Sequence, residues 1–243
     1  MSSIYFKQIG FHGSFNKPDL ETLKLIHKQH VMTVPFENLS MHCRERIVMD
    51  LEATYSKIMR NNRGGWCLEN NFLFGWVLRE MGYDCTTLNS KCFMTPLNDY
   101  YIFCLINEGG VWVLEKTNRK PKVLNPNFAK SSLINRIETK PVHHFTLTPR
   151  EPDSFLDIND KLQIDLTSVF VNKSICSLQT PTGFRALLGW TYSEVTFKPE
   201  EGVDIFDMRE VKDVEVDQIL TEKFNIKLPS KMTPVGNKSW YTI

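Results

Sequence analysis

The chain has 243 residues, enough to bury a substantial core as one large domain or as two to three small ones. Its composition, 42% hydrophobic and 23% charged, is ordinary for a soluble globular protein. A net charge of +1 without a basic or acidic block argues against nucleic acid or an anionic membrane as the main partner. The N-terminus lacks a signal-peptide pattern and no stretch approaches the length of a membrane span, so we expect a cytoplasmic protein.

The cysteines show neither a CxxC pair nor the cysteine–histidine spacing of a zinc site, so we expect no metal. In the cytosol we expect their thiols to be reduced, and most of them to be small buried hydrophobic side chains. The six are Cys43, Cys67, Cys85, Cys92, Cys104 and Cys176.

The first third of the chain is predicted to be helical. A first helix opens at Asp19 and ends before Pro35, because the residue preceding a proline is pushed out of helical geometry. Asp50 can cap a second helix. A third helix starts near Cys67 and stops at Gly82, and it is apolar nearly all round, so we expect it to be central and buried.

After Gly82 the pattern changes to short runs typical of antiparallel strands, with a hairpin turn at 107–110. A basic, proline-bearing loop is expected over 116–127, a short helix within 129–138 and a C-terminal helix over 214–224. These elements together predict the α+β class. The expected strands span 84–93, 100–106, 111–114, 143–147, 169–171, 176–179, 185–191 and 194–197.

The stretch Arg63-Gly64-Gly65-Trp66-Cys67 places a cysteine where a glycine-rich turn becomes a helix. Backbone N–H groups and the helix dipole favour negative charge at that point, so a thiolate forms there more easily. A thiolate attacks carbonyl and thioester carbon well. Cys67 is therefore the candidate nucleophile.

A general base for Cys67 is missing from the sequence that follows it. Between Tyr83 and Pro141 there is no histidine, and the only aspartates are Asp84 and Asp99. The histidines downstream of the motif are His143 and His144, which we interpret as structural or surface residues. We make the same interpretation of His42, which precedes the motif.

Residues 63–71 resemble the active-site motif of the arylamine N-acetyltransferases. The likeness extends to Val34-Pro35-Phe36-Glu37-Asn38-Leu39, to residues 174–181 and to the terminal Thr242-Ile243. It implies a cysteine-protease-like core in three segments. These are a helical bundle over 1–83, a truncated antiparallel β-barrel over 84–145, and an α/β lid with the C-terminal tail over 146–243.

The resemblance also implies a reaction. Acetyl-CoA would acetylate Cys67, and the thioester would pass its acetyl group to an arylamine or arylhydrazine. The family's catalytic residues form a Cys-His-Asp triad. The resemblance also implies a monomer.

Six further residues take roles from the resemblance, each with a simpler alternative. Arg63 and Glu37 would form a buttressing ion pair, or be two surface charges. Phe36 and Phe170 would line the acceptor pocket, or be core aromatics. Thr167 and Trp240 would contact coenzyme A, or be an ordinary loop threonine and a tail aromatic.

The likeness breaks in one place. After Tyr100 the family continues into a strand that carries the catalytic histidine, and an aspartate follows; here Tyr101 to Ile106 matches a strand that the family places later. A contiguous block with both triad partners is therefore missing, and we predict severely impaired activity.

Two other functions stay open. One is a catalytically inactive isoform, either a ligand-binding protein or a non-functional splice product. The other is a papain-like hydrolase or transglutaminase, against which the same missing histidine argues.

Overall fold

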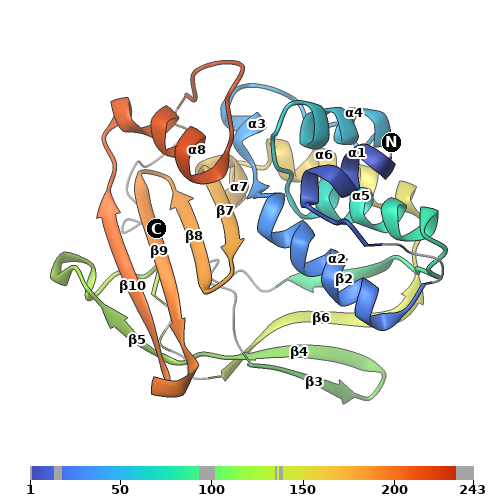
Figure 1. Cartoon of the computed structure of the whole chain (residues 1–243), viewed down its shortest axis with the longest axis horizontal. Helices are drawn as coiled ribbons and strands as arrows, with labels where there is room; N and C mark the ends of the chain where they lie inside the picture. The colour runs from blue at the N-terminus through green and yellow to red at the C-terminus, as the bar shows by residue number, and fades with distance from the viewer. Residues whose placement is uncertain (1, 14–17, 93–101, 135, 137–138, 234–243) are drawn as a thin grey trace.

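A computed structural model describes residues 2–13, 18–92, 102–134, 136 and 139–233. Most of the helices gather on one side of the molecule, a six-stranded sheet forms the other side, and a four-stranded sheet runs below the helices (Figure 1). The α+β class predicted from the sequence is confirmed.

The helical side is built from segments with clear start and stop signals. Asp19 Oδ1 accepts a hydrogen bond from Thr22 N at 2.8 Å, and Asp50 Oδ1 accepts one from Ala53 N at 2.8 Å, so both predicted caps are present. Gly82, with φ of +85°, follows the third predicted helix in the left-handed region that glycine favours. The helices are α1 (Ser2–Ile9), α2 (Leu20–Thr33), α3 (Leu39–His42), α4 (Leu51–Tyr55), which continues as a π-helical turn (Ser56–Arg60), and α5 (Cys67–Glu80).

A buried polar pair lies inside the core of these helices. The Tyr5 hydroxyl of α1 lies 2.8 Å from His30 Nδ1 of α2, and both side chains are buried. Burial, and to a smaller extent the nearby charge of His27, lower the pKa of His30 from 6.5 to about 4. His30 is therefore neutral in the folded protein near pH 7.

Acid is expected to destabilise the fold through His30. The unfolded chain binds more protons than the folded one between pH 6.5 and about 4, so stability falls as the pH falls through this window. The expected loss is on the order of 3 kcal/mol. Urea unfolding at about pH 7 and about pH 4.5 measures it, and His30→Gln should flatten the difference. The exposed His12 offers the control His12→Gln, and an equal acid loss in wild type and His30→Gln would contradict the prediction.

The six-stranded sheet has the order β1-β7-β8-β9-β10-β5 and joins distant parts of the chain. The short strand β1 pairs antiparallel with β7, so that Phe36 lies opposite Ser177, and β5 runs parallel to β10 at the other edge. The segment that precedes the Cys67 turn is thereby paired with strands from the C-terminal half of the chain. The strands are β1 (Phe36–Glu37), β5 (Lys120–Val123), β7 (Ile175–Thr180), β8 (Gly183–Leu188), β9 (Thr191–Lys198) and β10 (Val203–Glu210).

The four-stranded sheet corrects the prediction of a barrel. Its order is β2-β6-β4-β3, with every pairing antiparallel, and among the described strands its edges β2 and β3 pair neither with each other nor with the larger sheet. Closure into a barrel requires such edges to meet. The described strands therefore form two open sheets. Those of the smaller sheet are β2 (Leu88–Cys92), β3 (Ile102–Glu108), β4 (Val111–Thr117) and β6 (Thr139–Pro149).

Three local predictions were wrong. The run 169–171 is helical, as part of α7 (Val169–Asn172), because Ser168 Oγ accepts from Phe170 N at 3.2 Å and caps it. The expected loop over 116–127 contains β5, which forms because it pairs in parallel with β10. In the described part of 129–138 there is no helix, and a 3₁₀ turn (Pro126–Phe128) precedes it.

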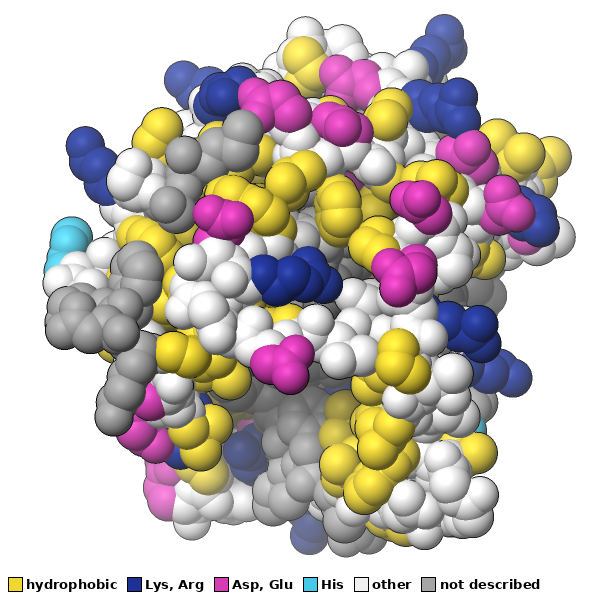
Figure 2. Space-filling view, turned by 90° about the vertical axis from the view of Figure 1, so that its right-hand side faces the viewer, with side chains coloured by type: hydrophobic (Ala, Val, Ile, Leu, Met, Phe, Trp, Pro, Cys, Tyr) yellow, Lys and Arg dark blue, Asp and Glu magenta, His cyan; other side chains and the backbone are white. Residues whose placement is uncertain are grey.

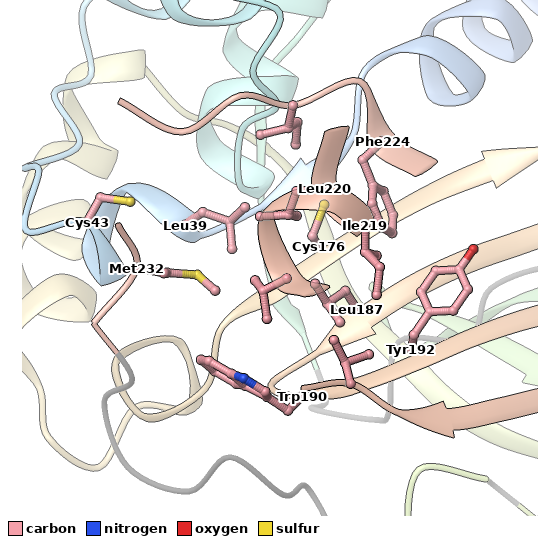
Figure 3. Close-up of a cluster of buried hydrophobic side chains, with 13 residues drawn as sticks. Leu39, Cys43, Cys176, Leu187, Trp190, Tyr192, Ile219, Leu220, Phe224 and Met232 are labelled. Carbon is pink, nitrogen blue, oxygen red and sulfur yellow. The ribbon is translucent and has the colours of Figure 1, made fainter. Parts of the chain in front are cut away.

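The C-terminal helix packs on the large sheet. Helix α8 (Val216–Phe224) places Ile219, Leu220 and Phe224 over Leu187 and Tyr192 of the sheet (Figure 3). Burial of these apolar side chains supplies the main stabilisation of this side of the molecule. The remaining helical segments are α6 (Leu156–Ile164) and the 3₁₀ turns Pro152–Phe155, Pro199–Glu201 and Asp213–Glu215.

Charges of both signs are mixed with hydrophobic side chains on the face that Figure 2 shows. This mixture fits the net charge of +1. Across the described ranges, no helix is both long enough and apolar enough to cross a bilayer.

Candidate functional site

Cys67 is the first residue of α5, and its side chain is exposed. The turn before it is held by the helix itself, since Glu69 Oε2 accepts from Trp66 N at 3.1 Å and Asn70 Nδ2 donates to Gly65 O at 2.7 Å. The first-turn N–H groups of a helix have no intrahelical acceptor and carry partial positive charge. The thiol is thus accessible and lies where negative charge is stabilised.

Strand β1 lies against this turn and fixes its path. Glu37 N donates to Gly65 O at 3.0 Å, and Gly65 N donates to Pro35 O at 3.2 Å. A Cβ on Gly64 would lie 2.1 Å from Pro35 O, and one on Gly65 would lie 2.7 Å from the Glu69 Cβ. Gly64 is therefore required because the Pro35 backbone approaches so closely, and Gly65 because the Glu69 and Asn70 side chains pack against it.

Arg63 and Glu37 form a buried ion pair beneath the turn. Arg63 Nε donates to Glu37 Oε1 at 3.0 Å, and Nη2 donates to Oε2 at 3.3 Å. The two side chains are only 5% and 0% exposed, so the alternative of two surface charges is wrong. Glu37 Oε2 also accepts from Leu39 N at 2.6 Å, and Arg63 Nη2 donates to Ser40 Oγ at 3.2 Å. The pair thus joins the turn to the start of α3.

A second, partly buried ion pair, which sequence reasoning missed, completes the network. Lys57 Nζ lies 3.0 and 2.9 Å from the two Glu69 carboxylate oxygens and 3.7 Å from Glu37 Oε1. Burial raises the pKa of Glu69, and the charge of Lys57 opposes that rise. Glu69 follows Cys67 by two positions, and an acidic residue in a first helical turn was the available signal.

The predicted acceptor residues lie together. The rings of Phe36 and Phe170 have centroids 6.4 Å apart, and the Phe170 ring meets Trp66 edge to face at 5.9 Å. Both phenylalanines are half-buried. Trp66 directly precedes Cys67, so this aromatic cluster adjoins the nucleophile turn.

The other predicted residues lie in several places. Thr167 is exposed in the turn before α7, where its backbone N and Oγ1 both donate to Asp165 Oδ1, at 2.8 and 2.7 Å. Trp240 and Asp99 lie outside the described residues. His143 and His144 lie on β6, and His143 Nδ1 is 3.0 Å from Ser90 Oγ of β2.

His42 ends α3 and is buried beside the Phe170 main chain, with its Nε2 3.2 Å from Phe170 O. It lies closer to the aromatic cluster than its interpretation as an unremarkable upstream histidine implied. Over the described ranges, no three histidine, cysteine, aspartate or glutamate side chains gather as ligands of a metal ion.

Comparison with known proteins identifies the family of this chain. Residues 19–102 and 94–233 match the N-acetyltransferase family in two overlapping segments. The chain is similar to the arylamine N-acetyltransferase pineal gland isozyme NAT-10 of Gallus gallus, with 37% identity over 285 aligned positions that cover 98% of each chain. It is 31% identical to arylamine N-acetyltransferase 1 of Homo sapiens, again over 98% of each chain.

Solved structures share the fold. The arylamine N-acetyltransferase of Mycobacterium marinum superimposes with a TM-score of 0.76 at 18% identity, covering 93% of both chains. That of Salmonella typhimurium gives 0.75 at 17% identity, covering 93% of this chain and 90% of its own. The sequence match, the fold and a cysteine at the start of α5 lead to one conclusion: this chain belongs to the arylamine N-acetyltransferase family.

Proposed function

We propose that the chain transfers acetyl groups from acetyl-CoA through a thioester on Cys67. The observation that carries the proposal is the exposed thiol at the first residue of α5, in a turn that β1, one buried ion pair and one partly buried ion pair hold in place. Support comes from the related Mycobacterium marinum enzyme, whose structure was solved in complex with CoA and superimposes with a TM-score of 0.75.

In the first half-reaction the Cys67 sulfur bonds to the acetyl carbonyl carbon, and the bond from that carbon to the coenzyme sulfur breaks. The electron pair of the broken bond stays with the coenzyme sulfur, which takes up the proton that Cys67 gave up. The N–H groups at the start of α5 favour the attacking thiolate. In the second half-reaction an arylamine or arylhydrazine nitrogen bonds to the acetyl carbonyl carbon, the bond from that carbon to the Cys67 sulfur breaks, and the proton that the nitrogen loses restores the Cys67 thiol.

We assign the roles of the other site residues from the same family relationship. Phe36 and Phe170 line the acceptor side, Thr167 and Trp240 contact the coenzyme, and Arg63 with Glu37 supports the turn. The enzyme works as a cytoplasmic monomer without a metal, in the three segments 1–83, 84–145 and 146–243.

We also propose that a contiguous internal block with the catalytic histidine and aspartate is missing after Tyr100. The aligned share of this chain, 98% of 243 residues, is about 238, so about 47 of the 285 positions aligned with the chicken isozyme have no residue here. The two family matches overlap at residues 94–102, which supports the proposal of a break in that region. Loss of two triad partners impairs both half-reactions.

Incubation of the purified protein with acetyl-CoA tests the proposal. Intact mass spectrometry is expected to show slow addition of a single acetyl group, and peptide mapping should place it on Cys67. The adduct should be absent from Cys67→Ala but form normally in Cys43→Ala, whose thiol is buried. An acetylated lysine in place of Cys67 would contradict the thioester. A complete lack of adduct would favour the inactive, ligand-binding isoform.

A further inference from the structure

Asn38 connects the nucleophile side of the molecule to the segment that carries Phe170. It is fully buried at the end of β1, and its Nδ2 donates to Phe170 O at 2.7 Å and to Lys173 O at 2.8 Å. Its Oδ1 accepts from Ile175 N at 2.7 Å. Both amide hydrogens and the amide oxygen are thereby used, and all three partners lie more than 130 positions away in the sequence.

These bonds determine the proton position on His42. Its Nε2 lies 3.4 Å from Asn38 Nδ2 and 3.2 Å from Phe170 O. Because both Asn38 amide hydrogens are donated in the shorter bonds to Phe170 O and Lys173 O, Asn38 has none to donate to the imidazole. His42 Nε2 therefore carries the proton and donates it to Phe170 O. That carbonyl oxygen accepts two hydrogen bonds, one for each lone pair.

The short helix α7 needs such outside donors. A helix of four residues, Val169–Asn172, leaves most of its carbonyl oxygens without intrahelical partners. Asn38 and His42 supply donors to Phe170 O, and the Phe170 ring contacts the rings of both Phe36 and Trp66. Asn38 directly follows Phe36 and Glu37 in the sequence. The same segment that holds the nucleophile turn therefore also holds the Phe170 ring.

We propose that Asn38 and His42 are positioning residues that set the acceptor side of the site. They hold the Phe170 ring against the rings of Trp66 and Phe36, on the side where the arylamine is proposed to bind. The inference rests on the proposed function, because it takes Phe36 and Phe170 as acceptor contacts. It concerns amine binding alone, so it can be tested without acetyl transfer.

Protection of Cys67 from alkylation gives the readout. Iodoacetamide modifies the exposed Cys67 thiol, and bound p-toluidine should slow that reaction in wild type, whereas cyclohexylamine should not. His42→Leu removes one donor to Phe170 O and is expected to weaken p-toluidine protection at least about fivefold. His42→Gln retains a donor and should stay within about twofold of wild type. The alkylation rate without amine should be the same in all three.

Asn38→Ala removes three hydrogen bonds and should weaken protection more than His42→Leu does. Its matched control is Asn159→Ala, because Asn159 is also a buried amide and donates to Ile47 O at 3.0 Å, in a contact between α6 and the segment after α3. That control should lower the melting temperature and leave p-toluidine protection unchanged.

Three results would overturn the proposal. They are unchanged protection in His42→Leu, equal weakening in His42→Leu and Asn159→Ala, and absence of p-toluidine protection in wild type. Failure of the thioester proposal looks different, since it would abolish the acetyl adduct and leave protection from iodoacetamide intact.

Discussion

A chimera carrying the aligned internal segment of the chicken pineal isozyme NAT-10 between Tyr100 and Tyr101 is expected to acetylate an arylamine at least about 10³-fold faster than this chain. The inserted segment should supply an imidazole that removes the Cys67 proton and a carboxylate that orients the imidazole. Thiol–imidazole ion pairs lower thiol pKa values far more than a helix terminus does alone. Steady-state release of the coenzyme thiol in the presence of p-toluidine measures the gain.

The chimera also provides its own controls. Alanine at each histidine of the inserted segment should return turnover to the level of this chain, and Cys67→Ser in the chimera should do the same. An unmodified chain that turns over p-toluidine as fast as the chimera would show that another group already serves as the base. In that case the proposed loss of an internal block would not explain the chemistry.

Arg63→Met is expected to cost about 3–5 kcal/mol of unfolding free energy. It leaves the Glu37 carboxylate fully buried, with Lys57 Nζ at 3.7 Å as a poorer partner. Glu37 also accepts from Leu39 N, so the start of α3 is disturbed together with the turn. Chemical denaturation with guanidinium chloride measures the loss.

The double variant Glu37→Gln/Arg63→Met should recover part of that loss, because no unpaired charge remains buried. The matched control is Lys24→Met, whose partner Glu21 lies at 2.7 Å on the surface, with side chains 60% and 82% exposed. That variant should change stability by less than about 1 kcal/mol. Equal effects of Arg63→Met and Lys24→Met would mean that the buried pair contributes no more than an exposed one.

The sequence predicted features that depend on local chemistry. Asp19 and Asp50 cap helices through their own side chains, and Gly82 stops one through its own backbone freedom, so a few neighbouring residues suffice to identify them. The start of α5 at Cys67 was visible for the same reason. The Arg63–Glu37 pair was inferred from family resemblance, and its burial was not readable from either residue.

Features that depend on distant partners were missed. Strand β5 exists because β10 offers a parallel edge about 80 residues later. The run 169–171 has strand-like composition, yet Ser168 caps it, the Phe170 carbonyl oxygen finds donors on Asn38 and His42, and it becomes helical. Lys57 and Glu69 are ordinary charged residues in sequence, and only the fold brings them within 3.0 Å. Tertiary context outweighs local propensity in each case.

Strand β1 is only two residues long, yet it bonds to β7 on one side and to the Gly65 backbone on the other. The backbone of the nucleophile turn is therefore hydrogen-bonded, through β1, to the large sheet. Hydrogen exchange at the backbone amides of Glu37 and Gly65 should therefore require unfolding of the cooperative unit that contains β7. Fraying of α5 alone should not expose these amides. Whatever its catalytic rate, the protein keeps its reactive sulfur in place for as long as that sheet survives.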